Sequence, residues 1–283
     1  MRWQSGRRSQ NVEDRRRSGP LRGFKIGGLG LLLILAFSFL TGQNPLRVLS
    51  LLMESTESTR APSPQTGEER YDAQKEFVSV VLADTEDTWQ RLFSEQGRDY
   101  EEPHLVLFSD QAQSACGFSS AAVGPFYCPL DSRVYLDLIF FRELNDRFGA
   151  SGDFAQAYVI AHEIGHHVQN LLGISEQVRR MQERAAEEDA NRLSVRLELQ
   201  ADCLAGVWGH HAGQRQLLES GDLEEALGAA AAVGDDRIQQ SAGRAVTPES
   251  WTHGSSEMRS HWFLQGFNTG EITSCDTFNT RSL

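Results

Sequence analysis

Basic residues are scarce in this chain once its first 25 positions are set aside. The 283 residues include 27 Lys and Arg and 39 Asp and Glu. Residues 1–25 hold eight of the basic residues and two of the acidic ones, which leaves 19 and 37 and a net charge of −18 for the remainder. Nucleic-acid-binding domains present basic surfaces. We therefore expect no nucleic acid among the partners of this protein.

Long hydrophobic runs are also lacking, with one exception at residues 24–42, FKIGGLGLLLILAFSFLTG. Its length is marginally sufficient to span a bilayer. The basic flank predicts that residues 1–23, for which we expect disorder, form a cytoplasmic tail, with the rest of the chain outside. A cleaved signal peptide is the alternative, because Ala36-Phe37-Ser38 resembles a cleavage site. That site lies inside the apolar run, which favours an uncleaved transmembrane anchor.

One domain is expected after the anchor. Residues 43–69 end in a polar stretch rich in Ser, Thr and Pro, typical of a linker, so the domain covers 70–283. Apolar spacing predicts strands over 104–109 and 133–137. It predicts helices over 71–93, 138–147, 153–173, 223–233 and 256–266, and one long helix or two over 175–212. The chain has no internal repeat. The predicted fold class is α+β, mainly helical with a small β-sheet.

One short stretch, Ala161-His162-Glu163-Ile164-Gly165-His166-His167, contains the pattern H-E-x-x-H. Positions four apart share a face of a helix, so His162 and His166 can point at one ion. Glu163, beside that face, can reach a metal-bound water. The pattern thus offers zinc two imidazole ligands and a base. It arises by chance in about one chain of this length in a hundred, which disfavours a merely polar helix.

A third ligand has to come from elsewhere in the chain. The pattern H-E-x-x-H-x-x-G-x-x-H is excluded, because Gln169 and Leu172 occupy the positions of its Gly and last His. Glu198 and Asp202, four apart on one predicted helix, fit a second solution: Glu198 binds the metal and Asp202 accepts the outer N–H of a ligand histidine. Two rival candidates lack an acidic partner four residues later: Glu187 and Glu188.

Three longer stretches resemble a known family. DFAQAYVIAHEIGHHVQNLLG (153–173), ELQADCLAGVW (198–208) and WTHGSSEMRSHWFLQGF (251–267) look like the bacterial putative neutral zinc metallopeptidase family. H-E-x-x-H followed by E-x-x-x-D resembles the gluzincins, such as thermolysin. The resemblance implies a zincin-like domain behind a single membrane pass, with one Zn²⁺ on His162, His166 and Glu198. Leu197 replaces the Asn of thermolysin-type sequences, so no further detail of that active site is transferred.

The predicted function is that of a membrane-anchored zinc metallopeptidase that hydrolyses a peptide or protein substrate, with Glu163 as general base. Its predicted location is the bacterial inner membrane, with the domain in the periplasm or outside the cell. One alternative is a non-catalytic, membrane-tethered zinc module, which would not need Glu163. Another is a zinc amidase acting on cell-wall peptides, because an activated water can attack any amide.

Several further residues have roles that the sequence leaves open. His253, in a loop of small residues before a helix, is the predicted donor to the oxyanion, with capping or packing as its alternative. Arg259 either supports His253 or pairs with Asp202. Residues 133–137 form either an edge strand for an extended substrate or a core strand. Two tyrosines are weaker candidates for substrate contact: Tyr127 and Tyr135. The remaining histidines are expected to be structural: His167, His210, His211 and His261.

Cysteines are few, and the predicted anchor would place all four in an oxidising compartment. Four cysteines allow three pairings. We favour Cys116 with Cys128, which flank one loop, and Cys203 with Cys275, which would tie the tail to the ligand helix. The alternative is a free thiol at Cys203, one residue past Asp202.

Overall fold

The computed structural model describes residues 1–16, 64–120 and 124–280. One compact unit comprises Met1–Arg17 and Gln74–Leu283, and the second, Ser18–Ala73, is described only from the start of helix α3 (Pro64–Glu95). The predicted anchor at 24–42 and most of the predicted linker therefore lie outside the described residues. Among the described residues, no helix has the length and apolar character needed to cross a membrane.

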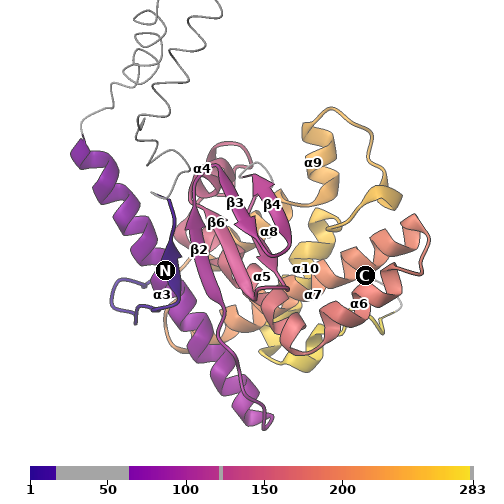
Figure 1. Cartoon of the computed structure of the whole chain (residues 1–283), viewed down its shortest axis with the longest axis horizontal. Helices are drawn as coiled ribbons and strands as arrows, with labels where there is room; N and C mark the ends of the chain where they lie inside the picture. Colours follow the sequence, from indigo (N-terminus) through magenta and orange to yellow (C-terminus); the bar gives the residue numbers. More distant parts are fainter. Residues whose placement is uncertain (17–63, 121–123, 281–283) are drawn as a thin grey trace, which may run out of the picture. The chain divides into compact units, whose positions relative to one another are not determined.

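A small mixed sheet has the strand order β1-β2-β6-β5. Strands β1 (Val12–Asp14), β2 (His104–Phe108) and β6 (Arg133–Asp137) are parallel, and β5 (Phe126–Cys128) runs antiparallel to β6. A separate hairpin joins β3 (Gln111–Ser114) to β4 (Gly117–Ser120). Figure 1 shows α3 running beside this sheet. The strand at 133–137 is thus internal to the sheet, and the edge beside it is β5.

Alternating side chains give the sheet two buried faces, as the two-residue period of a strand requires. Leu105, Leu107 and Leu136 point into the main core, which also contains Phe77 and Trp89 of α3. Val106, Phe108 and Tyr135 point the other way, into a smaller core that includes Ala112 of the hairpin. The apolar runs at 104–108 and 133–137 follow from this burial on both sides.

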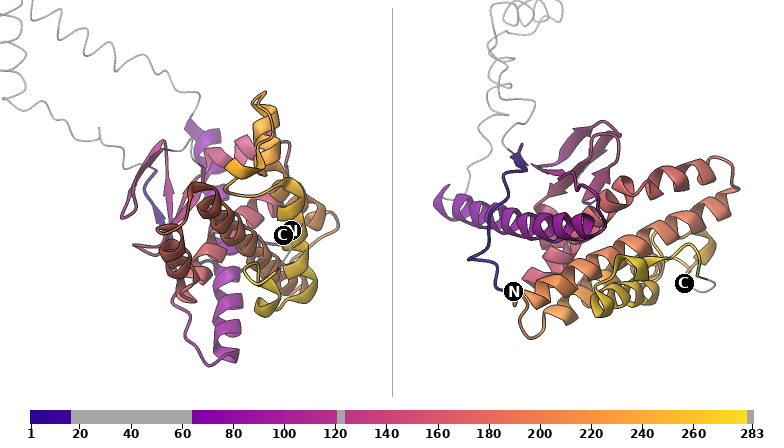
Figure 2. Two further views of the ribbon diagram at one scale, coloured as in Figure 1. Left: turned by 90° about the vertical axis from the view of Figure 1, so that its right-hand side faces the viewer. Right: turned by 90° about the horizontal axis from the view of Figure 1, so that it is seen from below.

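Helices make up the rest of the fold, and the views in Figure 2 show the long α7 (Glu187–Gln214) beside α10 (Ser256–Thr269). Helix α7 packs against α5 (Asp153–Leu171) and α10, and α5 also packs against α8 (Asp222–Ala232). In chain order, the elements are α4 (Ile139–Asp146), α5 (Asp153–Leu171), α6 (Ile174–Gln182), α7 (Glu187–Gln214), α8 (Asp222–Ala232), α9 (Asp235–Ser241), η2 (Pro248–Ser250), α10 (Ser256–Thr269) and η3 (Ile272–Cys275).

Close approach of α7 and α10 depends on two glycines. A Cβ on Gly206 would lie 2.0 Å from the Phe263 carbonyl oxygen, and one on Gly266 would lie 1.9 Å from the Cys203 oxygen. Cys203 also forms a disulfide with Cys275, and Cys116 forms one with Cys128. Both favoured pairings are confirmed, and with no free cysteine in the chain the alternative of a free Cys203 is excluded.

The prediction of a mainly helical α+β fold is confirmed for the described residues. The segment expected as one helix or two consists of α6 and α7, and α3 begins seven residues earlier than expected, at Pro64. The expectation of disorder at 1–23 is wrong for residues 1–16, which contain β1. The two strands of the hairpin and β5 were not predicted, because they are short and carry little hydrophobic alternation.

Candidate metal centre

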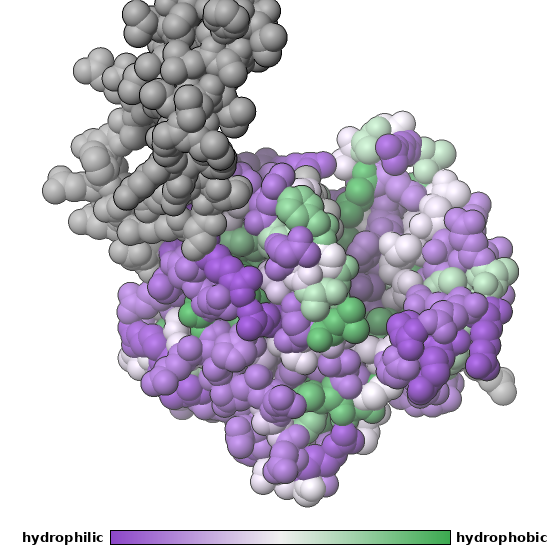
Figure 3. Space-filling view, in the orientation of Figure 1, coloured by the Kyte–Doolittle hydropathy of each residue, from purple (hydrophilic) through white to green (hydrophobic). Residues whose placement is uncertain are grey.

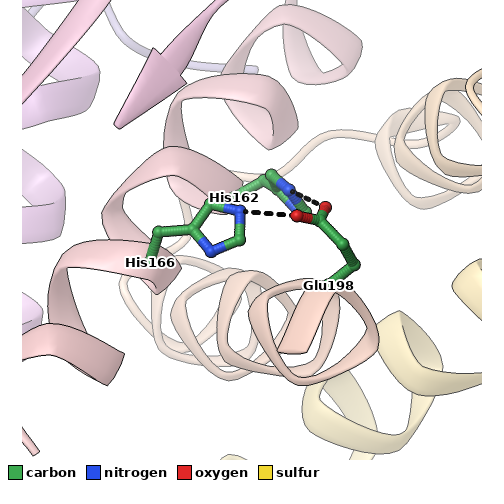
Figure 4. Close-up of side chains that lie close together, drawn as sticks. All are labelled: His162, His166 and Glu198. Atoms are coloured by element: carbon green, nitrogen blue, oxygen red, sulfur yellow. Dashed lines mark hydrogen bonds and ion pairs between the residues drawn. The ribbon is translucent and has the colours of Figure 1, made fainter. Parts of the chain in front are cut away.

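Three predicted ligands meet between α5 and α7 (Figure 4). His162 Nε2 lies 3.2 Å from Glu198 Oε2, and His166 Nε2 lies 3.3 Å from Glu198 Oε1. One donor atom from each residue lies within 4.8 Å of the other two. Two imidazole nitrogens and one carboxylate oxygen form the donor set of catalytic zinc sites, which keep a further position for water. The residues therefore fit a zinc ion, and His162, His166 and Glu198 would hold it.

Helix contact brings the ligands together. Gly165 lies within the H-E-x-x-H turn, and a Cβ there would lie 2.9 Å from the backbone oxygen of Ala201 on α7. The absence of a side chain lets α5 approach the turn of α7 that carries Glu198. The spacing of four residues places His162 and His166 on one face of α5, and Gly165 lets Glu198 of α7 come close to that face.

His162 is oriented by a buried carboxylate. Its Nδ1 lies 2.9 Å from Asp202 Oδ1, which also accepts a hydrogen bond from the Tyr158 hydroxyl. Arg259 donates through Nε to Asp202 Oδ2 at 2.8 Å and through Nη2 to Oδ1 at 2.9 Å. The open question about Arg259 is resolved in favour of Asp202. A hydrogen bond donated from Nδ1 to Asp202 would leave Nε2 of His162 free to bind a metal.

His166 is oriented by an amide instead. Its Nδ1 lies 2.9 Å from Gln169 Oε1, and Gln169 Nε2 donates to the Leu197 carbonyl at 2.7 Å and to Gln200 Oε1 at 3.1 Å. The sequence pattern assigned Gln169 no role beyond ruling out the longer histidine motif. Its position three residues after His166 on one helix is the signal that would have revealed this role.

Burial and neighbouring charges set the ionisation of the site. Burial raises the pKa of Glu198, but His166 and His162 more than offset it and hold that pKa well below its usual range. Burial lowers the pKa of His162, while Asp202 and Glu198 raise it, to about 10. These shifts favour an ionised Glu198, which is the form that binds a metal, and zinc binding at His162 would displace a proton from Nε2.

Glu163 is 8% exposed and faces the same cavity. Burial raises the pKa of its carboxyl, although His166 and His162 counteract this. A raised pKa lies closer to neutral pH, and a general base works best when its pKa is near the pH of the reaction.

His253 lines the cavity from the loop before α10. Its Nδ1 lies 3.3 Å from Asp235 Oδ1. Asp235 Oδ2 accepts backbone N–H groups from Thr252, His253 and Gly254 at 2.8, 2.7 and 3.1 Å. The hydrogen bond to Asp235, partly offset by burial, raises the pKa of His253. Asp235, for which no role was predicted, thus fixes both the loop and the imidazole.

The ligands open into a cavity of about 870 Å³. Its lining includes the apolar side chains of Phe126, Phe140, Phe148, Val159 and Ile238 and the guanidinium of Arg179. Figure 3 shows this hollow beside hydrophobic surface. Its volume and mixed lining suit an organic ligand rather than a bare ion.

Tyr127 lines the cavity and forms hydrogen bonds with residues of α5. Its hydroxyl lies 3.0 Å from His167 Nδ1 and accepts from Asn170 Nδ2 at 3.0 Å. His167 Nε2 lies 2.6 Å from the Glu101 carbonyl oxygen, so it carries the proton and Nδ1 accepts from Tyr127. His167 is therefore structural, as expected, and Tyr127 lines the cavity.

The other candidates lie away from the centre. Tyr135 donates to Asp131 on the hairpin side of the sheet. His210 and His211 bond to the backbone oxygens of Phe267 and Gly270, and His261 contacts the Trp262 ring. The rival carboxylates lie in the first turn of α7, exposed to solvent: Glu187 and Glu188.

The sequence of the chain is similar to that of a known protein family. A sequence profile of the family described as "Putative neutral zinc metallopeptidase" matches residues 1–278. The chain is 48% identical over 288 residues to "Uncharacterized protein YpfJ" of Escherichia coli (strain K12), covering 98% of this chain and 99% of that protein. It is 42% identical over 258 residues to "Uncharacterized protein Rv2575" of Mycobacterium tuberculosis (strain ATCC 25618 / H37Rv), covering 87% and 86%. No solved structure matches the chain.

Proposed function

Because the chain belongs to the family described as "Putative neutral zinc metallopeptidase", we propose that it is a zinc-dependent endopeptidase that cleaves peptide bonds in a peptide or protein substrate. The observation that carries the proposal is the arrangement of His162, His166 and Glu198 around one point, with Glu163 facing the same cavity. A closed structural zinc site would have four protein ligands and no need of a base.

In the proposed reaction, the substrate backbone lies along the cavity, with its scissile carbonyl near the three ligands. Zinc, when bound, supplies a Lewis acid and a water of lowered pKa. Glu163 accepts the proton of the attacking water and delivers it to the leaving amine, a role favoured by its raised pKa. His253, protonated and held by Asp235, donates to the oxyanion that develops on the carbonyl.

Asp202 and Arg259 act through His162 in this proposal. Together with Tyr158 they form a fully buried set of hydrogen bonds that holds the imidazole in one tautomer. Such outer partners of a metal ligand raise its basicity and fix its ring plane.

Two disulfides support a location of the domain outside the cytoplasm, because cytosolic thiols are kept reduced. Attachment to the bacterial cell membrane through residues 24–42 is part of the proposal and rests on the apolar character of that stretch.

The test is digestion of a peptide library by the full chain, with and without a chelator, combined with metal analysis. We expect one zinc per chain, and cleavage that chelation abolishes and zinc restores. Glu163→Gln should keep the zinc and lose cleavage by about 100-fold or more. Glu187→Gln, an exposed substitution on α7, is the matched control.

Three results would contradict parts of the proposal. Full cleavage by Glu163→Gln would refute the mechanism in which Glu163 is the general base. Stoichiometric zinc without cleavage of any peptide would favour the non-catalytic zinc module. Cleavage confined to amide bonds of cell-wall peptides would favour the amidase.

A further inference from the structure

The first residues of the chain are built into the folded unit that carries the metal centre. β1 pairs in parallel with β2, with Val12 opposite Leu105 and Asp14 opposite Leu107. Backbone bonds extend this ladder, from Leu105 N to the Asn11 oxygen and from Arg15 N to the Leu107 oxygen, both 2.8 Å. Upstream, Ser9 N donates to the Ser79 oxygen of α3 at 3.0 Å. Without β1, the N–H and C=O groups of β2 would form an open sheet edge.

A buried carboxylate on α3 is paired with side chains of the N-terminal segment, residues 1–16. Glu86 is 1% exposed, and within the described residues all its side-chain partners come from the N-terminal segment. Arg7 Nη2 donates to it at 2.8 Å, Ser9 Oγ at 2.5 Å and Asn11 Nδ2 at 2.9 Å. A buried charge without partners is strongly unfavourable. The surface of α3 around Glu86 is therefore suited to this segment and poorly suited to water.

Apolar contacts point the same way. Trp3 packs edge-on against Phe77 with ring centroids 5.3 Å apart, and Gly6 lies against Val80. Both α3 residues are at most 4% exposed. The family profile also extends over these positions. The segment therefore belongs to the domain by its sheet pairing, its charges and its packing.

We infer that residues Arg7–Asp14 and the metal centre occupy the same compartment, which a single membrane crossing at 24–42 does not allow. One crossing would place the segment and β2 on opposite sides of the bilayer, where they cannot pair. Because the two disulfides favour an oxidising compartment, this places the basic N-terminal segment outside the cytoplasm with the domain. Membrane attachment and peptidase activity are both compatible with this topology.

Accessibility of single cysteines in cells tests the inference. All four natural cysteines are in disulfides, so an added cysteine is the reactive thiol. Gln10→Cys reports on the segment and Asn145→Cys, on α4, reports on the domain; both positions are exposed. The full chain is expressed in bacteria, the outer envelope is made permeable, and a membrane-impermeant maleimide is added before or after lysis.

We expect both positions to be labelled before lysis to the same extent. Labelling of Asn145→Cys before lysis and of Gln10→Cys only afterwards would overturn the inference and support the single crossing. Protection of both until lysis would support the shared compartment and refute the proposed location outside the cytoplasm. None of these results depends on zinc or on cleavage, so the inference and the proposed function can fail separately.

Docking of the segment is tested on the purified chain. Asn11 donates to Glu86 and, at 2.7 Å, to Glu102. Asn11→Asp places a third carboxylate there and should lower Tm by about 5 °C or more. Gln10→Glu makes the same change from amide to acid one residue away, at an exposed position. This control should leave Tm within about 1 °C. An Asn11→Asp protein as stable as the control would show that the segment is not docked.

Discussion

Each ligand histidine is held by a different kind of acceptor. His162 donates to the carboxylate of Asp202, which Arg259 neutralises, whereas His166 bonds to the neutral amide of Gln169. Gln169 is itself fixed by the Leu197 carbonyl, one residue before Glu198. The amide therefore connects the second histidine to the backbone beside the third ligand, and its loss should loosen both.

Replacement of Gln169 by Met keeps the volume of the side chain and removes its acceptor. We expect zinc affinity to fall by about 10- to 100-fold, as for other outer partners of ligand histidines. Competition with a chromophoric chelator measures this. Gln177→Met, on the exposed face of α6, is the control. Unchanged affinity in Gln169→Met would show that the position of His166 is set by packing alone.

Asp235 provides a test through pH. Its hydrogen bond raises the pKa of His253, so in the native protein the imidazole keeps its proton to a higher pH than an unpaired histidine. Asp235→Asn lowers that pKa. If protonated His253 donates to the oxyanion, the basic limb of the kcat/KM profile must move to lower pH.

The neighbouring Asp236→Asn is the control, because Asp236 bonds Ser256 rather than His253. It should leave the basic limb in place. A profile in Asp235→Asn that matches the native one would exclude His253 as the titrating donor.

At the scale of elements, the site depends on how closely α5 and α7 approach. A Cβ at Gly165 would lie 2.9 Å from the Ala201 oxygen and 3.1 Å from its Cα, and these backbone atoms cannot move aside cheaply. Gly165→Ala should therefore cost about 1–3 kcal/mol of stability and weaken zinc binding, because Glu198 moves with α7. Thermal unfolding and zinc titration measure the two effects.

Gly228→Ala in α8 is the matched helical control. Among the described residues no atom lies within 4 Å of a Cβ built there. Alanine is favoured over glycine in a helix by up to about 1 kcal/mol, so this variant should be neutral or slightly stabilised. A Gly165→Ala protein that behaves like it would show that the helices are free to separate.

Residues of the site that lie close together in the sequence could be predicted, whereas contacts between distant residues could not. His162, Glu163 and His166 share one helix turn, and Glu198 with Asp202 shares another, so helical spacing was enough for both groups. That the two groups lie together was predicted because a catalytic zinc needs three protein ligands, not from a pattern that links the two helices. Gln169 could have been recognised by its spacing from His166.

Other parts had no local signal. The pairing of Asp202 with Arg259 spans 57 positions, and that of Asp235 with His253 spans 18. β1 is three residues long and contains Glu13 and Asp14, so its sequence lacks strand character. Its pairing is dictated by the open edge of β2 and by Glu86, which only the folded chain reveals.

At the scale of the whole molecule, the two disulfides close loops of very different size. Cys203 and Cys275 are 72 residues apart and join the end of the fold to α7, one residue past Asp202. Cys116 and Cys128 are 12 apart and join the start of β4 to the edge strand β5. In the chain-entropy description, a larger loop restricts the unfolded chain more.

Removal of each disulfide by paired Cys→Ser substitutions should therefore give unequal losses. The expected loss is about 4–5 kcal/mol for Cys203 with Cys275 and about 3 kcal/mol for Cys116 with Cys128. Denaturant unfolding of the zinc-free proteins measures both losses, with the native chain as reference. Zinc titration adds a second readout: the larger loop anchors α7, so its removal should also weaken zinc binding, whereas removal of the smaller one should not. Equal losses in stability would contradict the dependence on loop size. Unchanged zinc binding after loss of Cys203–Cys275 would show that the tail does not hold α7 in place.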